Sequence, residues 1–212
     1  MKKLLLLLLL AAIPARAAIT VAHSYSNCNT SANSCVTSST TVASGTMTST
    51  TTGNAVIVFV QWASTTSTVS LAATGGTVSF QVITGPITQA GNFRMEAWAD
   101  CNITGGTTAI TATQTGGGTQ FFDIHVWEVS GQNNSSHTAC FEGANSATST
   151  TGGNTANSIT CNVTVSSTDM LAGFLATGDT NTTHGTSPSA FVQVTNLDGN
   201  TSENFTVSGA GT

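Results

Sequence analysis

One stretch of the chain combines large apolar side chains with carboxylate and imidazole groups that could bind a ligand or take part in catalysis. It runs over residues 120–129 and reads QFFDIHVWEV. Successive side chains on a β-strand point to opposite faces. One face should therefore be apolar and buried, with Phe122, Ile124 and Val126. The other should be polar and aromatic at once, with Phe121, Asp123, His125 and Trp127.

A second stretch, 92–100, has the same two-faced pattern. Its apolar face holds Phe93, Met95, Ala97 and Ala99, and its other face holds Arg94, Glu96, Trp98 and Asp100. Sugars bind to flat aromatic platforms that are flanked by polar groups. The sequence thus offers one candidate ligand-binding face, formed by Glu96, Trp98, Asp123, His125 and Trp127. The plainer interpretation, which we favour, is that both tryptophans belong to the core.

Catalytic motifs are scarce. The carboxylates of Glu96, Asp123 and Glu128 could form a glycosidase pair, which needs two carboxyl groups about 5–10 Å apart. Neighbouring strands bring many carboxylates together, so these three residues are only weak evidence for a glycosidase. The sequence has no G-x-S-x-G, H-E-x-x-H, Walker or dinucleotide-binding motif. We predict a protein without enzymatic activity and without a cofactor.

A structural metal ion is also not predicted. The turns at 179–181 (DTN) and 198–200 (DGN) carry oxygen atoms that could bind calcium. Asx-rich turns have the same composition without any metal, and we favour that interpretation. The cysteines lack the close C-x-x-C spacing of a zinc or redox site.

The amino terminus is typical of an export signal. Lys2 and Lys3 precede an apolar run over residues 4–13, and ARA at 15–17 fits a cleavage site. The run is too short to span a bilayer. We therefore expect residues 1–17 to be a cleaved signal peptide and the mature chain to be secreted or held at the cell surface, with no membrane insertion after cleavage.

Export would leave an unusually anionic chain. Arg94 is the only Lys or Arg beyond residue 17, and one cation against nine Asp and Glu gives a formal charge of −8. Without a basic patch, nucleic acid and anionic lipid are poor partners. The absence of lysine after cleavage also excludes Schiff-base chemistry.

Five cysteines in an exported chain predict disulfides and one cysteine left over. Each of the two favoured pairs, Cys28 with Cys35 and Cys140 with Cys161, brackets a polar loop. Cys101 would then be unpaired. Sequence cannot fix the connectivity, so pairing of Cys101 with one of these cysteines stays open.

Short β-branched and apolar runs separated by Gly, Asn and Ser turns predict an antiparallel β-sandwich or barrel. The run at 55–62 is apolar on both faces, so we expect a central strand covered on two sides. A hairpin is expected around Gly75-Gly76, and Gly85-Pro86 should interrupt the pattern that follows. The expected strands are 19–26, 36–44, 55–62, 68–73, 77–83, 92–100, 107–115, 120–129, 158–165, 170–176, 190–195 and 204–207.

Several of these runs resemble a known family. NAVIVFV at 54–60, NFRMEAWA at 92–99 and NITGGTT at 102–108 are similar to strands of secreted bacterial β-sandwich domains, as are EVSG at 128–131 and DMLAG at 169–173. The resemblance implies a jelly-roll or lectin-like fold in an extracellular or cell-surface protein, with no shared catalytic residues. Such domains often carry an acidic residue in the final strand pair, which Glu203 would be.

The end of the chain departs from this family. Those domains usually continue past the Gly-rich turn into one more apolar strand, whereas this sequence ends with GAGT at 209–212. Either the sequence is a fragment, or residues 18–212 form a single domain that lacks a last strand, which another chain could supply.

Together, these features predict a structural or adhesive β-sandwich without catalytic activity. Self-association, or contact with neighbouring surface proteins, would be its mode of action. The alternative is a carbohydrate-binding module that uses the face with Trp98 and Trp127 to bind a glycan. A glycoside hydrolase is the least favoured possibility.

Overall fold

The structure is a computed structural model. It describes residues 18–27, 39–89, 93–117, 121–141, 143, 169–175, 192–197 and 200–206. Among these residues every regular element is a strand, and no helix is long and apolar enough to cross a membrane. The expected signal peptide, Cys28, Cys35, Cys161, the strand at 158–165 and residues 207–212 lie outside the described residues. So do both expected calcium turns apart from Asn200.

The strands are short and all their pairings are antiparallel. They are β1 (Thr20–Ser26), β2 (Thr41–Ala43), β3 (Ala55–Ala63), β4 (Thr68–Thr74), β5 (Gln81–Gln89), β6 (Phe93–Asp100), β7 (Ala109–Thr115), β8 (Phe122–Ser130), β9 (Met170–Leu175), β10 (Val192–Leu197) and β11 (Asn200–Thr206). The prediction of an all-β, antiparallel fold is confirmed.

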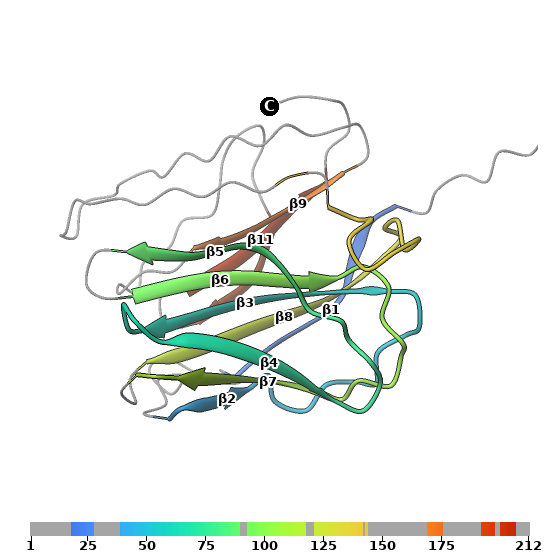
Figure 1. Ribbon diagram of the computed structural model, residues 1–212. Helices are drawn as coiled ribbons and strands as arrows, with labels where there is room; N and C mark the ends of the chain where they lie inside the picture. Colours follow the sequence, from blue (N-terminus) through green and yellow to red (C-terminus); the bar gives the residue numbers. More distant parts are fainter. Residues whose placement is uncertain are drawn as a thin grey trace, which may run out of the picture.

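Three sheets form a sandwich-like stack (Figure 1). The central sheet has the strand order β1-β8-β3-β6-β5. The sheet β2-β7-β4 packs on one of its faces, and the sheet β10-β11-β9 lies over the other. The strands of the central sheet therefore face two hydrophobic cores instead of one core and solvent.

The composition of β3 explains its central position. Val56, Val58 and Val60 alternate into the core shared with β2-β7-β4, and Ile57 and Phe59 alternate into the other core. All five are buried, as the sequence predicted for this strand. Complete burial of one such side chain contributes about 1.5–3 kcal/mol, so this strand supplies a large share of the stabilisation.

The predicted hairpin around Gly75-Gly76 is wrong. β4 pairs with β7 and β5 pairs with β6, so the chain crosses from one sheet to the other after β4. Gly75 and Gly76 both have positive φ, 68° and 54°. A Cβ on Gly75 would lie 2.4 Å from the Gly106 carbonyl oxygen, so the turn packs tightly on the β6–β7 connection. That contact, and not a two-residue hairpin, explains the glycine pair.

We expected Gly85-Pro86 to interrupt the strand pattern, but the strand continues through this dipeptide. β5 continues through it as an edge strand, with register shifts between Val82 and Thr84 and between Thr84 and Ile87. Proline is tolerated here because no strand among the described residues pairs with the outer side of β5 and needs the missing N–H. The Gly-Pro dipeptide therefore marks an irregularity in the pairing of β5 with β6, of the kind that a β-bulge produces.

Candidate functional site

The candidate aromatic platform, the less favoured of the two interpretations, does not form. Val58 on β3 pairs with Trp98 on one side and with Val126 on the other. Residues directly opposite in a sheet point to the same face. Trp98 therefore shares a face with Val126, and Trp127 lies on the opposite face. Trp98 is 5% exposed and Trp127 is fully buried, so the two tryptophans belong to different cores, as the plainer interpretation had it.

The Trp127 face of β8 lies beneath the third sheet. The Trp127 indole N–H donates to Ser202 Oγ on β11 at 3.2 Å, and His125 Nδ1 lies 3.4 Å from the same oxygen. Phe174 on β9 packs edge-on against the His125 ring, with centroids 5.0 Å apart. Burial lowers the pKa of His125 to about 4, so the ring is neutral at neutral pH. These side chains act as core residues.

The remaining predicted site residues do not converge either. Asp123 is 8% exposed and lies on the Trp127 face, whereas Glu96 lies on the Trp98 face. Burial raises the pKa of Glu96, and the Arg94 guanidinium opposes that shift. Arg94 itself donates to the Ser67 carbonyl oxygen at 2.9 Å. With Glu96 and Asp123 on opposite faces of the sheet, these two carboxylates cannot act as the glycosidase pair.

Glu128 is a buried carboxylate with three hydrogen-bond partners. Although it is only 1% exposed, it accepts hydrogen bonds from the Thr51 backbone N–H at 2.8 Å and from Asn54 Nδ2 at 2.7 Å. Its other oxygen lies 2.8 Å from His23 Nδ1 on β1. Hydrogen bonds of this kind offset the desolvation of a buried carboxylate. Glu128 thereby fixes the loop that enters β3.

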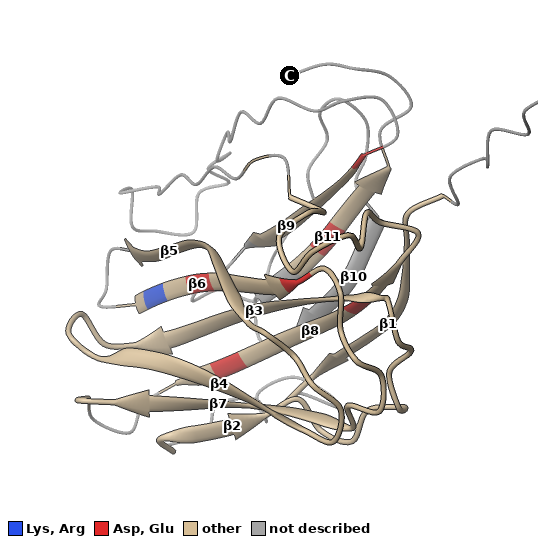
Figure 2. Ribbon diagram, turned by 45° about the vertical axis from the view of Figure 1, so that its right-hand side comes forward, with Lys and Arg blue, Asp and Glu red and all other residues tan. Residues whose placement is uncertain are grey.

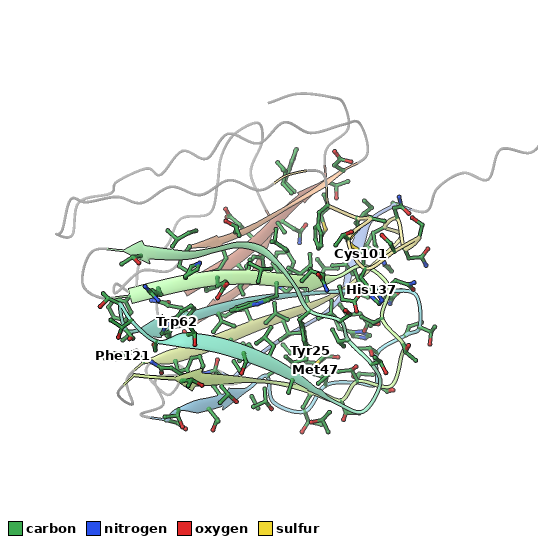
Figure 3. The ribbon with its side chains drawn as sticks, in the orientation of Figure 1. Tyr25, Met47, Trp62, Cys101, Phe121 and His137 are labelled. Atoms are coloured by element: carbon green, nitrogen blue, oxygen red, sulfur yellow. A yellow bond between two sulfur atoms is a disulfide. The ribbon has the colours of Figure 1, made fainter. Side chains whose placement is uncertain are left out.

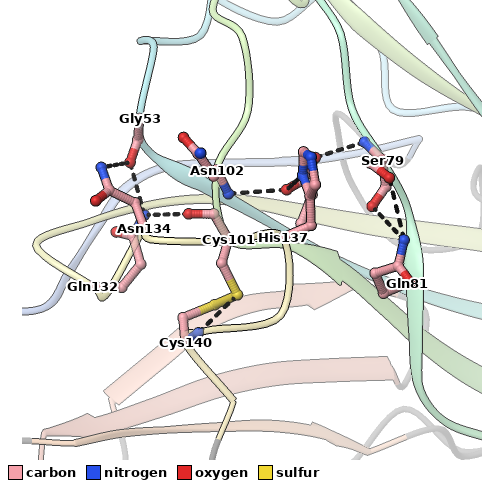
Figure 4. A network of polar contacts seen from close by, with 10 residues as sticks. Gly53, Ser79, Gln81, Cys101, Asn102, Gln132, Asn134, His137 and Cys140 are labelled. Atoms are coloured by element: carbon pink, nitrogen blue, oxygen red, sulfur yellow. Dashed lines mark hydrogen bonds and ion pairs between the residues drawn. A yellow bond between two sulfur atoms is a disulfide. The ribbon is translucent and has the colours of Figure 1, made fainter.

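Asp100, at the end of β6, has a similar role on a second loop. It is fully buried and accepts from the backbone N–H groups of Ser79 at 2.6 Å and Asn102 at 2.9 Å. His137 Nδ1 lies 2.6 Å from it, and the Cys101 N–H donates to the His137 carbonyl oxygen at 3.0 Å (Figure 4). The segment that follows β8 is thus bound to the end of β6.

A disulfide strengthens the same junction. Cys101 bonds to Cys140, with a Cα–Cα distance of 5.5 Å. The favoured pairing of Cys140 with Cys161 is therefore wrong, and Cys101 is not the unpaired cysteine. The open alternative, in which Cys101 joins one of the other cysteines, is correct. The physical reason is that β6 and β8 flank β3 and end beside each other, a proximity that loop composition does not reveal.

These contacts build a pocket at this end of the central sheet, where Figure 3 places Cys101 and His137. The pocket has a volume of about 470 Å³ and is lined by two segments, Thr52–Asn54 before β3 and Gly131–Asn134 after β8. Its walls carry amides, one threonine hydroxyl and glycine backbone, and no charged side chain. No described cluster of three or more His, Cys, Asp or Glu could hold a metal ion.

Hydrogen bonds fix the orientation of the pocket amides. Gln132 Nε2 donates to the carbonyl oxygens of Gly53 at 3.0 Å and Cys101 at 3.1 Å, and Asn134 Nδ2 also donates to Gly53 at 3.0 Å (Figure 4). Carbonyl oxygens only accept, so the nitrogen of each amide must face them. Asn54 likewise turns its nitrogen to Glu128.

Sequence reasoning did not single out these residues. In the sequence, Gly53-Asn54 is an ordinary turn signal, and Gln132 and Asn134 lie in a long polar run. The available signal was the density of amides beside a strand end, which a Thr- and Asn-rich sequence hides.

Comparison of the chain with family models, with curated proteins and with solved structures finds no match. The resemblance to jelly-roll or lectin-like domains stays a prediction.

Proposed function

We propose that this chain is an exported structural or adhesive β-protein without catalytic activity, which associates with copies of itself through edge strand β4. The jelly-roll-like topology, the cleaved signal over residues 1–17 and a location outside the cell are parts of the proposal. The Cys101–Cys140 disulfide supports it, because such bonds persist in oxidising compartments.

The observation that carries the proposal is the character of β4. This strand reads TVSLAAT and forms one edge of the β2-β7-β4 sheet. No strand among the described residues pairs with its outer side. Proteins usually protect such an edge with lysine, proline, a bulge or an inward charge. β4 has none of these features and pairs with β7 without a register shift.

The outer face of the same sheet is also open to contact. Its side chains are only Thr, Ser and Ala, in the rows Thr41–Thr113–Ser70, Ala43–Thr111–Ala72, Thr115–Thr68 and Ala109–Thr74. Figure 2 shows that β2, β7 and β4 carry no charge, whereas the described acidic residues lie on the other sheets and their connections. Copies that join at β4 therefore keep their like charges apart.

Sedimentation velocity of the mature chain over a concentration series tests this proposal. We expect reversible self-association, which Ser70→Lys and Ser70→Glu both reduce at least about tenfold, because a charged side chain on an edge strand disfavours pairing with another edge. Ser135→Lys, on an exposed loop, is the matched control. A chain that stays monomeric at every concentration, or association that neither Ser70 variant weakens, would overturn the proposal.

A further inference from the structure

We infer that the pocket between Thr52–Asn54 and Gly131–Asn134 binds a neutral saccharide. The inference concerns a different surface from the β4 edge and does not depend on self-association. The pocket volume of about 470 Å³ lies in the range of small-ligand sites, about 300–1,000 Å³.

The first step is the charge of the ligand. No charged side chain lines the pocket, and Glu128, behind Asn54, already has three partners. An anion would meet the field of a chain with a formal charge of −5, or −8 once residues 1–17 are removed, and no cation in the pocket wall. A cation would find no carboxylate among the residues that line the pocket to neutralise it. A neutral ligand meets neither cost.

The second step is the polarity of the groups that remain. The amide nitrogens of Asn54, Gln132 and Asn134 are committed to Glu128 or to backbone carbonyls. No described residue donates to the side-chain oxygens of Asn54 and Asn134. The pocket therefore presents acceptors, and the matching ligand must supply several donors on a compact neutral frame. A sugar ring with its hydroxyl groups has that chemistry.

The third step is how firmly the acceptors are held. Gln132 and Asn134 share the Gly53 carbonyl, and the Gln132 segment leads to the Cys101–Cys140 disulfide and the His137–Asp100 contact. Gly53 and Gly131 both have positive φ, 83° and 84°, a conformation that favours glycine and lets the two backbones approach. The acceptors are thus positioned before any ligand arrives, which lowers the entropic cost of binding.

The test uses amide NMR of the mature chain titrated with glucose, galactose, mannose and N-acetylglucosamine, with glucuronate and glucosamine as charged comparators. Because the pocket has no aromatic platform, we expect a dissociation constant of about 1 mM or weaker. Shift changes should concentrate at Thr52–Asn54 and Gly131–Asn134 for at least one neutral sugar, and the charged comparators should bind more weakly.

Two variants and one control sharpen the result. Asn134→Ala removes an acceptor while Gln132 still holds Gly53, so binding should fall at least fivefold in a folded protein. Asn134→Asp should shift preference towards glucosamine. Ser135→Ala, whose side chain lies outside the pocket, should change nothing. No shift changes with any neutral sugar, changes centred elsewhere, or equal binding by Asn134→Ala would each overturn the inference. Repeating the titration with Ser70→Glu separates this outcome from any failure of self-association.

Discussion

At the scale of single residues, two buried carboxylates have structural roles, including Glu128, which the sequence had offered as a candidate for a glycosidase pair. Asp100 and Glu128 are each almost completely buried, and each is held by two or more donors that include a histidine. Removing one partner of a buried charge leaves that charge uncompensated, which is costly. The two carboxylates fix the loops on either side of the pocket, and so they determine its shape.

His125 gives the fold a specific dependence on pH. Its pKa is about 4 in the folded protein, against 6.5 for an unperturbed histidine, because burial disfavours the charged ring. Between these values the unfolded chain binds a proton that the folded chain does not. The free energy of unfolding should therefore rise with pH through this window, by roughly 3 kcal/mol, and the contribution should be complete above pH 6.5.

The contribution of His125 to the free energy of unfolding can be measured by urea unfolding of the wild type and of His125→Gln at several pH values between 4 and 7. Gln cannot titrate, so the stability difference between the two proteins should change with pH by that amount. The carboxylates contribute equally to both curves and cancel. Parallel curves for the two proteins would show that His125 keeps its proton affinity on folding.

At the scale of elements, the segment after β8 depends on the disulfide. The cysteines are 39 residues apart, and a loop of that length predicts about 4 kcal/mol of stabilisation through the unfolded state. In Cys101→Ser/Cys140→Ser we expect this loss, together with faster amide exchange over residues 131–141. Cys161→Ser is the control and should leave the Cys101–Cys140 bond intact in non-reducing peptide mapping. A stability loss confined to Cys161→Ser would contradict the pairing.

The strands themselves followed well from the sequence, since β-branched runs and Gly or Asn turns are local signals. The observed β3, β6 and β8 closely match the expected ranges. Alternation also separated the two faces within each strand, as Trp98 and Ala99 show. What alternation cannot give is the register between strands. That register, set by β3 pairing with both β6 and β8, places Trp98 and Trp127 on opposite faces.

The pocket could not be predicted from the sequence, because it also depends on the pairing of distant strands. Asn54 and Gln132 are 78 positions apart, and they meet only because Ala55 pairs with Val129 across β3 and β8. Likewise, a polar segment gives no sign that a third sheet will cover the polar face of β8. Local composition predicts elements, whereas sites and layers come from pairing between distant ones.

At the scale of the whole molecule, the third sheet should be part of one cooperative unit. Phe174 on β9 stacks on Phe59 with ring centroids 5.2 Å apart and also contacts His125. Phe59 in turn packs edge-on against Trp127. This chain of rings joins β10-β11-β9 to the middle of the central sheet, the most buried part of the described residues.

Phe174→Ala should therefore destabilise the entire protein by about 2–4 kcal/mol, somewhat less than a fully buried Phe because Phe174 is only partly buried. Tryptophan fluorescence and far-UV circular dichroism should report one coincident urea transition. Phe121→Ala is the matched control: that ring is 47% exposed and should cost less than about 1 kcal/mol. If the Phe174 variant instead lost β10-β11-β9 in an early, separate step, the third sheet would be a detachable cover, and the two-core description of the central sheet would fail.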